Sequence, residues 1–100
     1  MKTLIEILPE AADFVRALAP EPRRKLRLAI RGLEHGKGDI QPLRDELEGL
    51  QRLRVNDFRI IFREYFRGQR VVRVVFVMKR SFGYEALAQL LLDELDESRN

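Results

Sequence analysis

The spacing of the apolar residues changes halfway along this chain, and this change constrains the fold more than any other feature. In the first third, apolar residues recur every three or four positions, as on one face of a helix. The two stripes are Ala11, Phe14, Val15 and Leu18, and then Leu26, Ala29, Ile30 and Leu33. From residue 51 onward, apolar and polar residues alternate, as in strands with one buried face. The sequence therefore predicts two helices followed by a sheet on which they can pack.

Turn-forming residues divide the first half into elements. Thr3–Leu8 is predicted to be a short strand, and the following helix begins near Pro9, because proline fits the first helical turn. Ala19-Pro20-Glu21-Pro22 ends this helix and begins the next one. The second helix ends at His35-Gly36-Lys37-Gly38, where glycine can adopt the left-handed conformation of a cap.

The second half is predicted to hold three strands and a final helix. The strands are Gln51–Val55, Phe58–Phe66 and Val71–Met78, and Asn56-Asp57 forms a two-residue hairpin turn. A leucine stripe predicts a helix from residue 84 onward: Leu87, Leu90, Leu91 and Leu95. The predicted class is α+β with the order β-α-α-β-β-β-α. An antiparallel sheet packs against an N-terminal helix hairpin, and residues 1–100 form a single domain.

Several functions are excluded by what the sequence lacks. It has no cysteine, so it has no disulfide, thiol nucleophile or thiolate metal site, and this fits a cytoplasmic location. Its one histidine, His35, lies at a predicted helix end, and no phosphate-binding glycine motif is present. We therefore expect no metal and no cofactor. The apolar runs are too short for a membrane span.

Positive charge is concentrated in one segment of the chain. Residues 50–85 carry nine basic and three acidic side chains, a net charge of +6, whereas the whole chain has only +3. A segment of this charge attracts a polyanion, and nucleic acid is the usual one. The alternative is a solvated strand face without a ligand.

The strand pattern predicts that six side chains converge on one shallow concavity. Arg52 and Arg54 share a strand face, Arg59 begins the neighbouring strand, and the others follow the last strand. The six residues are Arg52, Arg54, Arg59, Lys79, Arg80 and Tyr84. Guanidinium groups bind phosphate through paired hydrogen bonds, so this set could act on RNA, whose 2′-hydroxyl is a built-in nucleophile.

These residues resemble the RelE/ParE superfamily of bacterial toxins, which belong to toxin–antitoxin modules. The resemblance spans about forty residues and rests on an R-x-R-x-x-x-[YF]-R pattern, a hydrophobic strand and K-R-x-x-x-Y. The matching stretches are Leu47-Glu48-Gly49, Arg52-Leu53-Arg54-Val55-Asn56-Asp57-Phe58-Arg59-Ile60-Ile61-Phe62, Val75-Phe76-Val77-Met78-Lys79-Arg80, and Tyr84. The helix hairpin before them and the helix after them also fit the order of the family.

The resemblance implies a toxin whose basic sheet face enters the ribosome and cuts mRNA, which blocks translation and arrests growth. By position, Arg59, Arg80 and Tyr84 correspond to catalytic residues, and Arg52, Arg54 and Lys79 to RNA and phosphate contacts. The resemblance further implies a cognate antitoxin that neutralises the toxin, and a toxin–antitoxin hetero-oligomer on operator DNA.

One departure from the family concerns the general base. The RelE-like branch carries lysines where this chain has Arg52 and Arg54, and a guanidinium cannot lose a proton. Tyr84 and Lys79 are the candidates that remain, with Glu48 as a further one. We expect Tyr84 to have the larger role and Lys79 to hold phosphate.

Two other functions are compatible with the same residues. A ParE-like toxin has this fold but inhibits DNA gyrase without catalysis, and the missing lysines favour it. Arg59, Arg80 and Tyr84 together favour the endoribonuclease instead. The third alternative is an inactive toxin relic that only binds its antitoxin.

Overall fold

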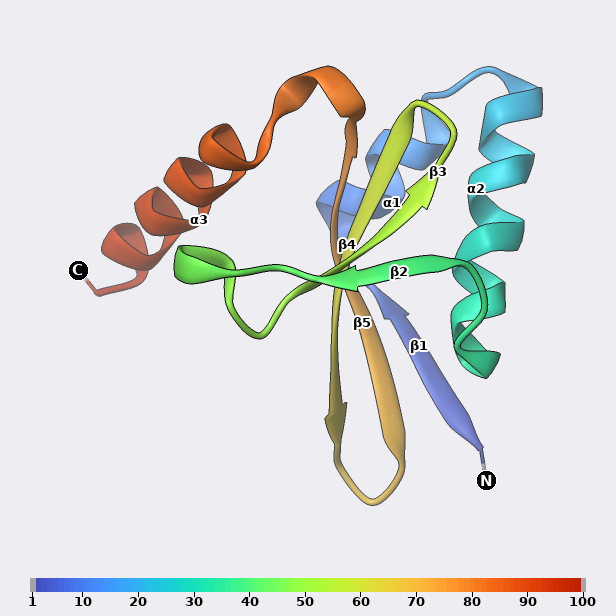
Figure 1. Cartoon of the computed structure of the whole chain (residues 1–100), viewed down its shortest axis with the longest axis horizontal. Helices are drawn as coiled ribbons and strands as arrows, with labels where there is room; N and C mark the ends of the chain where they lie inside the picture. The colour runs from blue at the N-terminus through green and yellow to red at the C-terminus, as the bar shows by residue number, and fades with distance from the viewer. Residues whose placement is uncertain (1, 100) are drawn as a thin grey trace.

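The computed structural model describes residues 2–99, with side chains as far as residue 93. Three α-helices lie in this range: α1 (Pro9–Arg16), α2 (Pro20–Gly32) and α3 (Tyr84–Arg99). The five strands are β1 (Thr3–Ile7), β2 (Asp39–Pro42), β3 (Gln51–Val55), β4 (Phe58–Phe66) and β5 (Arg70–Lys79). Figure 1 shows α1 and α2 on one side of the sheet and α3 on the other.

The sheet has the strand order β1-β5-β4-β3-β2. All neighbouring strands are antiparallel except β1 and β5, which are parallel. The predicted α+β class is confirmed, and the sequence elements follow the predicted order with one addition. The addition is β2. The sheet is mixed rather than wholly antiparallel, because β1 pairs with β5 in parallel. The helix hairpin carries the chain from β1 at one edge of the sheet to β2 at the other edge.

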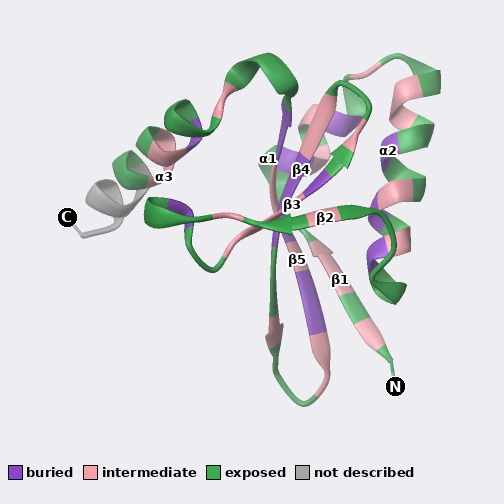
Figure 2. Cartoon of the chain, viewed as in Figure 1, coloured by how far each residue is buried: buried purple, intermediate pink, exposed green. Residues whose placement is uncertain are grey.

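The larger core lies between the sheet and the α1–α2 hairpin, on what we call the hairpin face of the sheet. Figure 2 shows buried residues along the inner sides of both helices and on the central strands. The buried members from the strands are Leu53, Ile60, Phe62, Val72, Val74 and Val77, and those from the helices and the turn after α2 are Ala11, Val15, Leu26, Ile30 and Leu33. The two apolar stripes of the sequence therefore face this core, as amphipathic helices require.

A smaller core lies on the opposite side of the sheet, which we call the α3 face. Its buried members are Leu47, Ile61, Met78 and Leu87, with Leu91 packed against them. The predicted leucine stripe of the last helix thus packs on the sheet through Leu87 and Leu91. Leu95 lies outside the residues whose side chains are described.

A bulge interrupts the pairing of β4 with β5. Ile61 pairs with Phe76 and Phe62 pairs with Val74, so Val75 is an extra residue on β5. A bulge changes which face the following residues occupy. Val72 and Val74 pack on the hairpin face before it, and Val77 does so after it.

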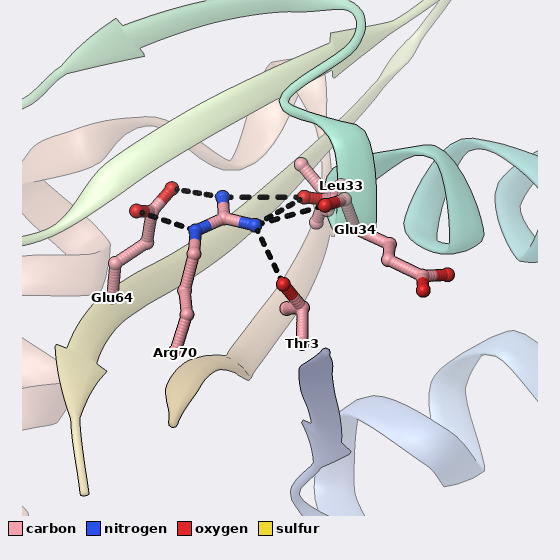
Figure 3. A network of polar contacts seen from close by, with 5 residues as sticks. All are labelled: Thr3, Leu33, Glu34, Glu64 and Arg70. Atoms are coloured by element: carbon pink, nitrogen blue, oxygen red, sulfur yellow. Dashed lines mark hydrogen bonds and ion pairs between the residues drawn. The ribbon is translucent and has the colours of Figure 1, made fainter. Parts of the chain in front are cut away.

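The Arg70 side chain links β1 and β4 to the turn that follows α2 (Figure 3). Its guanidinium donates to the Glu64 carboxylate at 2.9 and 3.3 Å, to Thr3 Oγ1 at 3.3 Å, and to the carbonyls of Leu33 and Glu34 at 3.0–3.3 Å. Those carbonyls belong to the short turn after α2, where the Leu33 carbonyl also accepts a hydrogen bond from the Gly36 N–H at 3.1 Å. Arg70 therefore stabilises the docking of the hairpin on β1, β4 and β5.

Among the described residues, no helix combines the length and the apolar character that crossing a membrane needs.

Candidate nucleic-acid interface

Five arginines of the strands share the α3 face of the sheet. Directly paired residues of antiparallel strands lie on the same face, and three such pairs hold all five. The pairs are Arg52 with Ile61, Arg54 with Arg59, and Arg63 with Arg73. Ile61 belongs to the core beneath α3, which assigns the set to that face. The positive segment of the sequence thus becomes a basic surface beside α3.

Three of the predicted site residues meet at the turn between β3 and β4. Arg54 and Arg59 flank the Asn56-Asp57 turn as a direct pair, and Arg59 Nη1 donates to the carbonyl of Asn56 at 2.9 Å. The backbone N–H of Arg80 donates to the carbonyl of Asp57 at 2.7 Å. This hydrogen bond fixes the start of the Arg80–Phe82 turn against the hairpin. The structure therefore brings Arg54, Arg59 and Arg80 to one end of the sheet.

Tyr84 follows this cluster as the first residue of α3. It lies four positions after Arg80, and its side chain is exposed. The intervening Gly83 has a φ of +84°, and its carbonyl accepts a hydrogen bond from the Leu87 N–H at 3.3 Å. The chain thus turns from the end of β5 into α3 next to the arginine cluster.

Arg52 is held by the strand that the sequence did not predict. Its guanidinium donates to Gln41 Oε1 at 2.8 Å and lies 3.5 Å from the Asp39 carboxylate, both on β2. Only 13% of its side chain is exposed. Arg54 is exposed and has no polar side-chain contact within the described residues, so it is the strand arginine of β3 that a ligand can reach.

Lys79 lies away from the arginine cluster. It pairs with Phe58, whose ring packs edge-on against Phe14 of α1, with the centroids 6.2 Å apart. Lys79 therefore lies on the hairpin face. The cause is the bulge at Val75, since a regular strand would put Lys79 on the same face as Arg73. Of the six predicted site residues, Arg52, Arg54 and Arg59 share the α3 face, Arg80 and Tyr84 follow at the same end of the sheet, and Lys79 lies on the opposite face.

A second polar cluster on the α3 face was not singled out from the sequence. Tyr65 Oη donates to Glu6 at 2.8 Å, and Arg73 Nη2 donates to Tyr65 Oη at 2.6 Å and to Glu6 at 3.3 Å. The Tyr65 hydrogen bond and the nearby Arg73 and Arg67 hold the pKa of Glu6 below its ordinary value. The sequence signal was the alternation of Arg59, Arg63 and Tyr65 along β4, but Glu6 joins them only through the parallel pairing of β1.

The arrangement at the turn can bind and stabilise a phosphate, and it has one group that exchanges protons. Arg54 and Arg80 present exposed guanidiniums, which bind phosphate oxygens by charge-assisted hydrogen bonds. The Tyr84 hydroxyl can both donate and accept a proton, which a guanidinium cannot do.

No protein-family model matches the sequence, and no curated protein is similar to it in sequence. Solved structures do resemble it. A YoeB/ParE toxin from Agrobacterium tumefaciens has a TM-score of 0.64 at 18% identity, over 76% of this chain and 96% of that one. The toxin–antitoxin complex RelBE2 from Mycobacterium tuberculosis gives 0.62 at 19% identity, over 80% and 100%.

An archaeal RelE–RelB complex from Pyrococcus horikoshii OT3 is similar to the same degree. Its TM-score is 0.66 at 20% identity, and the match covers 83% of this chain and 100% of that one. The shared part is therefore nearly the whole of each solved chain. The protein has the fold of the RelE/ParE toxins.

Proposed function

We infer that this protein is the toxin of a toxin–antitoxin pair and that it cuts mRNA on the ribosome. The observation that carries the inference is the meeting of Arg54, Arg59 and Arg80 at one turn, with Tyr84 following on the adjacent helix. The fold of RelE and YoeB/ParE toxins supports it. A cytoplasmic location follows from this function.

The reaction is an attack of the RNA 2′-oxygen on the adjacent phosphorus. A bond forms between the 2′-oxygen and phosphorus, and the bond from phosphorus to the 5′-oxygen breaks. The products are a 2′,3′-cyclic phosphate and a 5′-hydroxyl end. The 2′ proton goes to a base, and another proton goes to the leaving oxygen.

The residues of the cluster divide these tasks. Arg54 and Arg80 bind the phosphoryl oxygens and stabilise the charge that develops on them in the transition state. Tyr84 accepts the 2′ proton as phenolate and returns one to the 5′-oxygen as phenol. Arg59 is anchored to the Asn56 carbonyl, so it stabilises the turn beside which Arg54 and Arg80 lie. The ribosome supplies the orientation of the scissile ribose.

Cell-free translation tests the function directly. Addition of the purified protein should stop protein synthesis, and mapping of mRNA ends should show breaks at particular codons in ribosome-bound message. Arg80→Gln should lose most of this cleavage, whereas Arg24→Gln on the outer side of α2 should retain it. Intact mRNA in an arrested reaction would contradict the inference.

Inhibition of DNA gyrase is the second candidate, and one contact favours it. Arg52 is mostly buried against Asp39 and Gln41, so its charge is already paired. A site with fewer free cations, and with arginine in place of lysine at both basic positions of β3, suits a toxin that binds a protein target. Gyrase-dependent double-strand breaks in DNA, with unbroken mRNA, would select this function.

A cognate antitoxin is the partner we propose for the groove beside β1. Solved relatives of this fold are complexes with an antitoxin. The groove measures about 380 Å³; Ile5, Ile7 and Ile30 line it, and Arg27 and Arg31 stand at its side. An acidic amphipathic segment fits this lining, because it would bury the isoleucines and pair with the arginines. Co-purification with the product of the adjacent gene should fail when Arg27 and Arg31 are changed to Glu.

A further inference from the structure

A second groove lies on the α3 side of the sheet, away from the turn between β3 and β4. It runs between the start of α1, the bulged part of β5 and the middle of α3, with a volume of about 440 Å³. Phe76, Leu90 and Leu91 belong to its apolar lining. Arg63, Arg73 and Glu10 are its charged groups. A pocket of this size, with an apolar wall and a few charged groups, is typical of a small-ligand site.

The two arginines of the groove are arranged as an incomplete anion site. Arg63 and Arg73 are direct cross-strand partners, and like charges in that position repel. Glu6 and Tyr65 hold the Nη2 edge of Arg73, but its buried Nε has no hydrogen-bond partner within the described residues. Buried polar atoms normally have one. Arg63 is exposed and makes no polar contact to the described part of the chain. An anion in the groove would pair with Arg63 and would be attracted by the charge of Arg73.

The start of α1 adds to the preference for an anion. Leu8 occupies the N-cap position and gives no side-chain hydrogen bond, and Pro9 is the first helical residue. Both residues line the groove. The positive end of the helix dipole, with its free backbone N–H groups, therefore borders the same space as the arginines.

We propose that this groove binds one nucleotide of the RNA strand, and that it prefers guanine. The phosphate lies on Arg63 and Arg73, and the base packs against Phe76 and Leu90. Glu10 then faces the base rather than the phosphate, and its carboxylate accepts hydrogen bonds. Guanine presents two adjacent N–H donors on its Watson–Crick edge, which match the two oxygens of a carboxylate, whereas uracil presents one.

The groove is placed so that one RNA strand could occupy both it and the proposed cleavage site at the turn between β3 and β4. Arg63 follows Arg59 by four residues on the same face of β4, which is about 13 Å along the strand. The groove is thus a further subsite for the same RNA. This inference rests on the proposed function for its substrate, but the groove can be tested without the ribosome.

The test is a titration of the full chain with guanosine 5′-monophosphate, followed by NMR. The methyl signals of Leu90 and Leu91 and the Nε–H signal of Arg73 should shift together. Uridine 5′-monophosphate and inorganic phosphate should bind more weakly. Arg63→Gln should weaken the binding of guanosine 5′-monophosphate about tenfold or more, because a charge-assisted contact is lost. Glu10→Gln should reduce the preference for guanosine over uridine, and Arg24→Gln should change neither.

Two outcomes would overturn the proposal. One is a titration in which the nucleotide shifts signals near Arg80 and Tyr84 but leaves those of Leu90 and Leu91 unchanged. The other is equal affinity for inorganic phosphate and the nucleotide, which would show that the groove does not recognise a base. Neither readout involves cleavage, so a negative result for the groove is distinguished from a failure of the proposed endonuclease function.

Discussion

Arg54 and Arg59 are direct partners across β3 and β4, so two guanidiniums start from adjacent positions on one face of the sheet. Arg59 is turned toward the carbonyls of Asn56 and Phe58, at 2.9 Å from each, while Arg54 extends into solvent. A like-charge pair of this kind destabilises a sheet. The pair lies at the end of the sheet where Arg80 adds a third positive charge. Such a concentration of positive charge is expected where a phosphate binds.

Replacement of Arg54 should separate stability from activity. Arg54→Gln should raise the free energy of unfolding by about 0.5 kcal/mol, since it removes the repulsion from Arg59. The same change should lower mRNA cleavage about tenfold or more, because a charge-assisted phosphate contact is lost. Urea unfolding and a cleavage assay measure the two effects. The gain in stability should shrink at about 1 M salt, where charges are screened within about 3 Å.

Tyr84→Phe should remove the proton-exchanging group without affecting the fold. The side chain is exposed, so the free energy of unfolding should be unchanged. Ribosome-dependent cleavage should fall by about 100-fold or more, which is the usual contribution of general acid–base catalysis. Single-turnover cleavage of ribosome-bound mRNA gives the rate. Full activity in Tyr84→Phe would remove the role we assign to this residue.

Glu6 should make the stability of the protein depend on pH. Tyr65 and Arg73 hold its pKa below the ordinary value of 4.5, so the folded state favours the ionised carboxylate. The resulting stabilisation is complete above pH 4.5 and is lost as the pH falls through the lower, folded-state pKa. Glu6→Gln should therefore be less stable than the wild type at neutral pH, and the two should converge in acid. Urea unfolding across this range measures the difference; a constant gap would contradict it.

Arg70→Lys should show how much the contacts of Figure 3 contribute. Lysine keeps the charge but cannot bind Glu64 and the carbonyls of Leu33 and Glu34 at once. We expect a loss of about 2 kcal/mol in the free energy of unfolding. Arg24→Lys, on the exposed side of α2, is the matched control and should change little. Equal effects of the two would mean that the contacts of Arg70 contribute nothing measurable.

The elements with a local pattern were predictable from the sequence. Strands β3 and β4 alternate regularly, and Asn56, with a φ of +52°, forms the turn that joins them. Strand β2 was missed because Asp39–Pro42 contains one apolar side chain and a proline. It is an edge strand that forms through backbone pairing with β3. The parallel pairing of β1 with β5 is equally invisible, since it joins residues far apart in the chain.

The same limit applies to the candidate site. The grouping of Arg54 and Arg59 follows from alternation and a two-residue turn, so the sequence predicts it. The position of Lys79 depends on the bulge at Val75, which no residue pattern announces. The pairing of Arg52 with Asp39 depends on β2. The groove lined by Arg63 and Arg73 has Leu90 and Leu91 of α3 as its other wall, so it depends on where α3 packs on the sheet.

Gly38 directly precedes β2 and lies against Leu53, and its replacement should test the role of that strand. Its φ is +114°, and an added Cβ would lie 2.5 Å from Leu53 Cδ1 in the buried core. Gly38→Ala should therefore lower the free energy of unfolding by more than about 2 kcal/mol, through strain and the displacement of Leu53. Gly36→Ala is the matched control, because Gly36 also has a positive φ but nothing lies within 4 Å of an added Cβ. It should cost only about 1 kcal/mol. Since β2 carries the partners of Arg52, Gly38→Ala should also free that guanidinium and increase the salt dependence of RNA binding, whereas an unchanged salt dependence would show that β2 does not restrain Arg52.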